Sequence, residues 1–352
     1  MYEYGNARVR AMKGRLLSRR ALEGLVERYD VNQVVSALAQ TDYAPDISAA
    51  LAKRGGVECV EEALRLNLAR TTRALLRFYQ GEARELVELL VERYDLFNLL
   101  TILRGRVARA SPEEIAEALL PGGRLGEPVL VELARQADVR QVVDLLATWR
   151  IAYARPLTAA MREYSQSGDL AVLEVALLKY AYGQAIDRLS RGGRNVQVVR
   201  RAFGDEIDAV NLTTILRICQ QRQRPEASEL RRQLIEHGTR LDVDGLISLC
   251  ELEGVDKVLA RLSGTPYGAV LNGALDQFVA TGRVSSLQRA LERHLTQESV
   301  RLFHGDPLGI DVVVAYLAAK NAELANLRLI SRGIWLGLGK EEILEGVWVP
   351  GT

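Results

Sequence analysis

The histidines and cysteines of this chain are the side chains best suited to metal or nucleophilic chemistry, and both are few. His237, His294 and His304 lack the His-Glu-x-x-His spacing that places two imidazoles on one helix face. The sequence contains no Cys-x-x-Cys pair and no phosphate-binding Gly-x-x-x-x-Gly-Lys-Ser/Thr loop. It therefore predicts no metal and no other cofactor.

The remaining reactive side chains also argue against an active site. Cys59, Cys219 and Cys250 are odd in number and widely spaced, so we expect buried free thiols in a reducing compartment and no disulfide framework. The acidic pairs Glu61-Glu62 and Glu113-Glu114 are adjacent on predicted helices, so their carboxylates diverge. An enzyme is accordingly the least favoured class of protein.

Composition indicates a helical protein without a strongly charged partner. The 352 residues carry 46 basic and 45 acidic side chains, which argues against nucleic acid as a ligand. Few prolines and aromatics among many Leu, Ala, Arg and Glu residues predict an all-α fold. Met1–Tyr4 does not resemble a signal peptide, and apolar stretches such as Val312–Ala319 are far below the roughly 20 residues that span a bilayer. We therefore expect membrane contact only through a partner.

One motif occurs three times. An acid is followed by x-x-Asn-Leu-x-x-Ile-x-Arg, and the copies begin at Asp95, Asp208 and Glu323. These spacings of 113 and 115 residues fit a small domain better than a solenoid repeat. We therefore predict three homologous helical domains, over residues 1–109, 110–224 and 225–352.

Further elements recur in the same order around this motif. A Gly/Arg-Leu turn begins at Gly14, Gly123 and Gly238, and a Val-rich helical pattern follows it at Val31, Val139 and Val255. Agreement of several elements in register makes a chance match improbable. We therefore expect the function to depend on a partner or a space that three copies of one domain surround or join.

The repeated polar residues are expected to hold helices together. On a helix, Leu99, Ile102 and Leu103 form a buried stripe with Asn98 at its edge. Such an asparagine can bond the open backbone of a neighbouring helix end, and the acid one turn earlier can hold its amide. The predicted clip residues are Asp95, Asn98, Asp208, Asn211, Glu323 and Asn326. The alternative is that these residues face a partner.

The arginine that ends each motif points away from the apolar stripe. Arg104, Arg217 and Arg332 are therefore candidates for an interdomain or partner-facing surface, with a solvated face as the alternative.

The motifs also resemble a known family. The segments that carry the resemblance are Tyr4–Gly14, Glu206–Leu212, Leu262–Tyr267, Asp306–Gly309, Asn326–Gly333 and Trp348–Pro350. Each is weak alone, but together they span the chain in order. They resemble the C subunit of archaeal-type and vacuolar-type rotary ATPases, which is called the d subunit in eukaryotic enzymes.

This resemblance implies a three-domain helical funnel with pseudo-threefold symmetry. It implies a non-catalytic rotor component at the cytoplasmic face of the membrane, seated on the proteolipid ring. The funnel would receive the central shaft, which the D and F subunits form, and transmit torque between ATP chemistry and proton or sodium transport. Arg8, Arg10 and Lys13 on the first helix are candidates for the wall of its cavity, with a solvated basic face as the alternative.

Two other classes of protein remain open from the sequence. A helical-repeat adaptor that binds an unrelated protein would form an open superhelix with a long groove. An unrecognised hydrolase or metal enzyme would bind metal stoichiometrically or turn over a substrate.

Overall fold

The computed structural model describes residues 2–221, 225–252 and 254–351, and its regular elements in those ranges are all helical. The predicted all-α class is thus confirmed. The chain divides into two compact units, residues 1–154 with 300–352, and residues 155–299. The three sequence copies are a separate division that stays a prediction, and residues 222–224, beside its second boundary, lie outside the described residues.

The helices of the first unit come from both ends of the chain. Its elements are α1 (Glu3–Lys13), α2 (Arg19–Val26), α3 (Val31–Leu38), α4 (Ala44–Leu51), α5 (Gly56–Phe78), α6 (Gly81–Val107), α7 (Pro112–Ala118), α8 (Glu127–Ala134), α9 (Val139–Thr148), the 3₁₀ turn η1 (Leu302–His304), α19 (Asp311–Trp335) and α20 (Lys340–Gly346).

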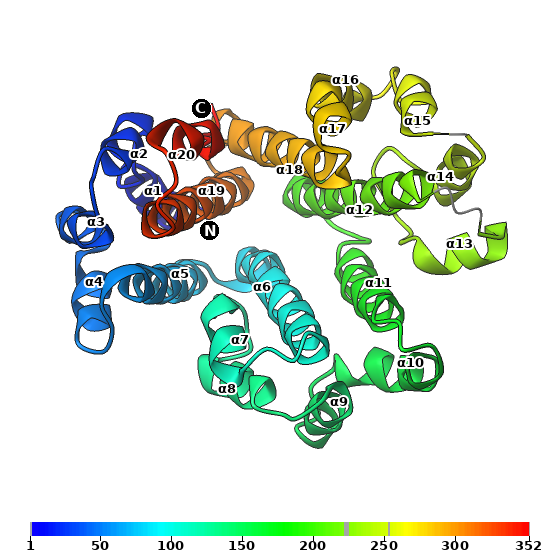
Figure 1. The fold of residues 1–352 in the computed structure, drawn as a ribbon, viewed down its shortest axis with the longest axis horizontal. Coiled ribbons are helices and arrows are strands. Elements are labelled where there is room, and N and C mark those ends of the chain that lie inside the picture. The colour runs from blue at the N-terminus through cyan, green and yellow to red at the C-terminus, as the bar shows by residue number, and fades with distance from the viewer. Residues whose placement is uncertain (1, 222–224, 253, 352) are drawn as a thin grey trace. The chain divides into compact units, whose positions relative to one another are not determined.

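The long helix α19 organises this unit. It packs against α1, α2, α3 and α5, which precede it by more than 200 residues, and Figure 1 shows it beside α1. Leu327 and Ile330 of α19 are fully buried in one apolar cluster with Leu22 of α2 and Val34 of α3. The first unit therefore needs the C-terminal segment to complete its core.

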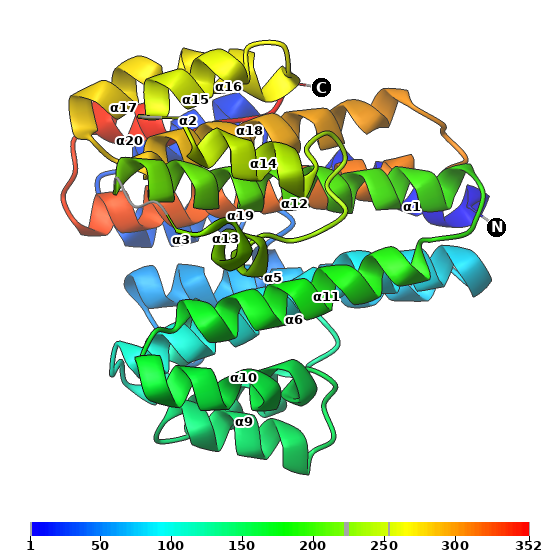
Figure 2. The same ribbon diagram turned by 90° about the vertical axis from the view of Figure 1, so that its right-hand side faces the viewer.

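The second unit is built around α12. Its helices are α10 (Ala154–Ser167), α11 (Ala171–Arg188), α12 (Arg194–Gln220), α13 (Ala227–Gln233), α14 (Val243–Cys250), α15 (Val255–Arg261), α16 (Pro266–Gly273), α17 (Leu275–Thr281) and α18 (Val284–Arg301). α11, α14 and α15 pack against α12, which Figure 2 shows from the side. Leu212 and Ile215 of α12 are buried with Leu246 of α14 and Val258 of α15.

Helix starts follow local side-chain chemistry. The carboxylate of Asp30 accepts a hydrogen bond from the backbone N–H of Gln33 at the start of α3, and Asp138 does the same for Gln141 at the start of α9. Each bond satisfies an amide that has no partner within its own helix.

Two glycines allow short helices to cross long ones closely. A Cβ at Gly105 of α6 would lie 2.4 Å from Cγ1 of Ile115 on α7, and one at Gly333 of α19 would lie 2.8 Å from Cγ1 of Ile343 on α20. No side chain fits at either crossing without displacing a buried isoleucine.

Gly333→Ala should therefore destabilise the protein by about 1–3 kcal/mol, because the added methyl group overpacks the α19–α20 crossing. Urea-induced unfolding measures the change. Gly24→Ala on α2 is the matched control, since its Cβ would meet nothing within 4 Å and alanine favours a helix interior by about 0.5–1 kcal/mol. Equal stability changes for the two variants would contradict this account.

Candidate functional site

The repeated asparagines bind backbone groups just beyond short helices. In each copy the side-chain amide both donates to and accepts from a single residue, at 2.7–3.0 Å. The three pairs are Asn98 with Leu120 after α7, Asn211 with Ile235 after α13, and Asn326 with Trp348 after α20. Each asparagine therefore holds a long helix against the segment that follows a short helix.

The acid one turn earlier binds a different target from the one expected. The sequence prediction has it hold the asparagine side chain, but Asp95 accepts from the backbone N–H groups of Arg124 and Leu125, both at 2.9 Å. A Cβ on Gly123 would lie 2.0 Å from Oδ1 of Asp95, so this turn approaches the carboxylate closely because it begins with glycine.

The second copy repeats this geometry and adds a tyrosine. Asp208 accepts from the backbone of Arg240 at 2.9 Å and of Leu241 at 3.3 Å. The hydroxyl of Tyr267 donates to the same carboxylate at 2.8 Å. Gly238 again starts the turn, and a Cβ there would lie 2.0 Å from Oδ1 of Asp208.

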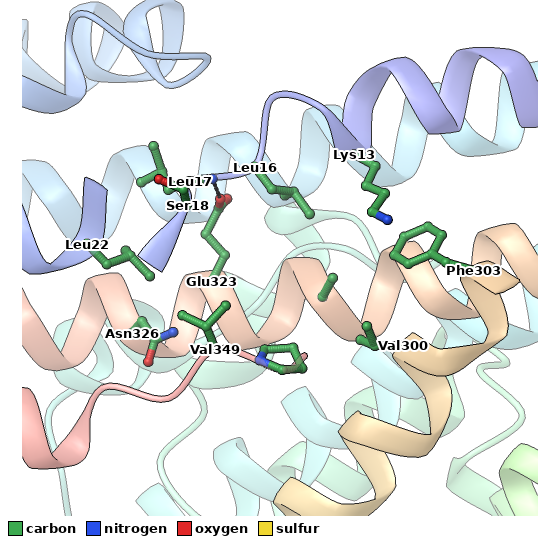
Figure 3. A pocket seen from close by; sticks show the side chains of 12 residues that line it. Lys13, Leu16, Leu17, Ser18, Leu22, Val300, Phe303, Glu323, Asn326 and Val349 are labelled. Carbon is green, nitrogen blue, oxygen red and sulfur yellow. Dashed lines mark hydrogen bonds between the residues drawn. The ribbon is translucent and has the colours of Figure 1, made fainter. Parts of the chain in front are cut away.

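The third acid reaches the beginning of the chain. Glu323 accepts from the backbone N–H of Leu17, in the turn between α1 and α2, and from the hydroxyl of Tyr43 at 2.6 Å. The ammonium group of Lys320 lies 2.8 Å from the same carboxylate and 2.9 Å from that hydroxyl. Figure 3 shows Glu323 pointing from α19 toward Leu17.

We call each acid with the turn it binds an acid clasp. In order along the chain, the acid of copy one binds the turn of copy two, the acid of copy two binds the turn of copy three, and the acid of copy three binds the turn of copy one. The clasp contacts therefore have a cyclic order.

Burial dominates the electrostatics of the first two clasps. Desolvation raises the pKa of Asp95 to about 6 in spite of two backbone donors. Desolvation also raises the pKa of Asp208 to about 6, against the opposing effect of the Tyr267 hydrogen bond. In the third clasp, burial lowers the pKa of Lys320 while Glu323 opposes that shift.

A cavity of about 240 Å³ lies beside the third clasp. Leu16, Phe303 and Val349 contribute to its largely apolar wall, and Glu323 forms part of its polar wall. The ammonium group of Lys13, at its edge, lies 4.0 Å from the centre of the Phe303 ring.

Two of the sequence segments that carried the family resemblance meet in the first unit. The side-chain amide of Asn6 donates to the carbonyl oxygens of Pro307 at 2.8 Å and Gly309 at 2.9 Å. Its own carbonyl accepts from the hydroxyl of Tyr79 at 2.7 Å. This contact joins α1 to the loop that precedes α19.

The predicted basic side chains of α1 contact Phe78 and Phe303. Arg8 is exposed, and its guanidinium lies 5.5 Å from the centre of the Phe78 ring. Arg10 is exposed and donates to the carbonyl oxygen of Phe303 at 3.4 Å, on the same side as Lys13. The structure holds no partner chain, so partner binding by these residues stays a prediction.

The three arginines that end the repeated motif lie in the last turns of α6, α12 and α19 and are exposed. Arg217 donates to the side chain of Gln288 at 2.8 Å, and Arg332 pairs with the buried carboxylate of Glu61. Arg104 is exposed at the end of α6. Their role as a partner-facing surface also stays a prediction.

Sequence reasoning missed Tyr43, Tyr267 and Lys320 as clasp residues. A signal existed for the tyrosines, because Thr41-x-Tyr43 and Thr265-x-Tyr267 match within the repeat. Among the described residues no group of three or more His, Cys, Asp or Glu side chains is placed to hold a metal ion. No described helix has both the length and the apolar character needed to cross a membrane.

These features define an all-helical protein whose repeated polar residues join helices. The chain belongs to the ATP synthase (C/AC39) subunit family, whose model matches residues 5–346. It is therefore a non-catalytic component of an ATP synthase complex, and the family resemblance predicted from its motifs is confirmed.

Relatives align along almost the whole chain. The C subunit of the A-type ATP synthase of Methanocaldococcus jannaschii is 27% identical over 342 residues, which cover 97% of this chain and 85% of the relative. The C subunits of the A-type ATP synthases of Methanosarcina mazei and Haloferax volcanii are each 28% identical over 97% of this chain, and the matches cover 91% and 95% of those proteins.

Asp95→Asn should flatten the pH dependence of stability between about pH 4 and pH 6. An unfolded aspartate titrates near its ordinary value of 3.8, and the folded one near 6, so the folded state holds an extra proton in this window. Stability is therefore lost as pH rises through it. At about 1.4 kcal/mol for each pKa unit, the loss is on the order of 3 kcal/mol.

Urea unfolding at intervals from pH 4 to pH 7 measures this slope. Asp276→Asn, at an exposed acid of α17, is the control and should leave the wild-type slope unchanged. Parallel curves for the wild type and Asp95→Asn would show that the Asp95 carboxylate does not titrate as described.

Asn211→Asp should destabilise the protein by roughly 1–3 kcal/mol at neutral pH. The substitution keeps the side-chain shape, removes the donor to the carbonyl of Ile235 and sets a carboxylate against that oxygen. Thermal or urea unfolding provides the measurement. Asn272→Asp, at an exposed position of α16, should change stability by no more than about 0.5 kcal/mol. An equally small effect at Asn211 would refute the clip.

Proposed function

We propose that this chain is a rotor component of an A/V-type ATPase, a socket that joins the central shaft to the proteolipid ring. In this proposal its three sequence copies, residues 1–109, 110–224 and 225–352, form a funnel-shaped body with pseudo-threefold symmetry. The D and F subunits occupy the funnel, and the ring lies beneath it at the cytoplasmic face of the membrane. The chain transmits torque, hydrolyses nothing and carries no ion.

The cyclic order of the acid clasps is the observation that carries this proposal. In an open row of repeats, the acid of the last copy has no following turn to bind. Here Glu323 of the last copy binds Leu17 of the first, and Tyr43 of the first copy donates to it as well. Contacts that pass from copy to copy and return to the start favour a closed body around an axis.

The clasps also supply the stiffness that a torque adaptor needs. Asp95, Asp208 and Asn98 are at most 2% exposed, and hydrogen bonds tie each of them to backbone outside its own helix. Breaking such a contact leaves a buried donor or acceptor without a partner, which costs about 1–3 kcal/mol. Bending at a clasp is therefore opposed by polar groups as well as by apolar packing.

Two groups of basic residues are the proposed partner contacts. Arg8, Arg10 and Lys13 share α1 and suit an acidic stretch of the shaft. Arg104, Arg217 and Arg332 end three equivalent helices and suit a partner that presents the same loop several times. A charge total close to zero permits separate patches for two different partners.

A helical-repeat adaptor for an unrelated protein is the second candidate. The internal repeat fits it equally well. The contact between Glu323 and the first copy favours the socket, because an adaptor gains its long groove by leaving the ends of the repeat apart.

Reconstitution of the rotary complex with and without this chain tests the proposal. Without it, we expect ATP hydrolysis by the head to continue while ion transport driven by ATP falls to background, because the shaft no longer turns the ring. Adding the wild-type chain should restore ion transport and couple it to ATP hydrolysis in a fixed ratio. Normal ion transport in its absence would overturn the proposal.

A pair of charge reversals sharpens this experiment. Arg10→Glu should weaken binding of the D–F shaft and lower the ratio of transport to hydrolysis. Arg20→Glu, at another exposed arginine close to α1 in sequence, should leave that ratio unchanged. Equal behaviour of the two variants would remove Arg10 from the proposed shaft contact.

A further inference from the structure

Two cysteines that are distant in sequence meet in the second unit. Cys219 lies in the last turn of α12, and Cys250 is the last residue of α14. The two helices pack together, with Cys219 in the apolar cluster of this unit and Cys250 against that cluster. Their side chains interact directly with each other.

The two thiols differ in access and in acidity. Cys219 is 8% exposed and Cys250 is half-buried, so a small reagent reaches the pair from the Cys250 side. The interaction with Cys250 lowers the pKa of the Cys219 thiol, and the same interaction together with burial raises the pKa of Cys250. A thiol with a lowered pKa has a larger thiolate fraction, which is the reactive form.

The third cysteine provides an internal reference. Cys59 lies in α5 of the other unit, is fully buried, and has a pKa raised by burial. A buried thiol with a raised pKa is protected from oxidants.

We propose that Cys219 and Cys250 are a redox site, where a peroxide oxidises the two thiols to a reversible disulfide between α12 and α14. This inference is independent of the proposed function, since it concerns only contacts inside the second unit. It also goes beyond the sequence prediction of buried free thiols without a disulfide framework. The cysteines are free in the reduced protein, and two of them are placed to react together.

The chemistry requires only hydrogen peroxide and the two thiols. The Cys219 thiolate attacks one peroxide oxygen, the O–O bond breaks, and the departing hydroxide takes a proton to become water, which leaves a sulfenic acid on Cys219. The sulfur of Cys250 then attacks that of Cys219. The S–O bond breaks, and the oxygen leaves as a second water with the proton from Cys250. Both thiols are oxidised and the peroxide is reduced.

The disulfide would link the end of the helix that carries Asp208 and Asn211 to the end of α14. Asp242, which caps the start of α14, directly follows Leu241 of the second clasp turn. Oxidation would therefore add a covalent tie between two elements that the second clasp already holds together, and should raise the unfolding temperature of this unit.

Mass spectrometry of the full chain after treatment with hydrogen peroxide tests this proposal. We expect a mass loss of about 2 Da, corresponding to two hydrogens, and a fall from three to one in the thiols that react with a maleimide after denaturation. Peptide mapping should find Cys219 joined to Cys250. Dithiothreitol should reverse both changes.

Two variants provide controls. Cys59→Ser should lose about 2 Da as the wild type does, whereas Cys250→Ser should gain oxygen, about 16 Da or its multiples, without forming the link. Persistence of all three thiols, or a link that involves Cys59 or a second chain, would overturn the proposal. The peptide map of the wild-type protein decides the question even if a variant does not fold.

Discussion

A buried carboxylate that binds the backbone of a distant turn is the interaction on which this fold depends. Burial of a charged group is costly, and each acid recovers part of that cost through donors aimed at it. Asp95 has two backbone amides, and Asp208 has two amides and a tyrosine hydroxyl. The turn cannot move away without leaving the carboxylate buried and unpaired, so its position is set by electrostatics as well as by packing.

The third clasp joins segments that are far apart in the sequence. Fewer than 35 residues separate Asp95 and Asp208 from the turns that they bind, whereas Glu323 and Leu17 lie more than 300 residues apart. The first two clasps fold a local segment, and the third must bring together the two ends of the protein. Contacts at such sequence separation carry a large loop-closure entropy, so the third clasp depends on the apolar packing of α19 against α1, α2 and α3.

Sequence patterns could predict what is local in this structure. The buried stripe of Leu99, Ile102 and Leu103 follows from helical periodicity, and the caps at Asp30 and Asp138 follow from residue type. The resemblance of several weak motifs, taken in order, indicated the family. The stripe and the caps depend on residues within one or two helical turns of each other.

The partners of the acids could not be predicted in the same way. The spacing of Asp95 and Asn98 made a bond between their side chains the simplest expectation, because both lie on one helix face. Which of them meets the turn at Arg124 depends on how α6 crosses its neighbours, and one sequence does not determine that crossing. The pairing of Tyr43 with Glu323, and of Cys219 with Cys250, has the same origin in long-range packing.

The charges beside the acids differ in a way that matches these connections. Three residues before the acid, the first two copies carry Glu92 and Asp205, and each adds a like charge that raises the pKa of its clasp acid. The third copy carries Lys320 there, 2.8 Å from Glu323. The two side chains form a buried ion pair. In the third clasp, where no short chain segment joins the acid to its turn, an ion pair supplements the hydrogen bonds. In the first two clasps, a short chain segment keeps the turn near the acid even when the acid is protonated.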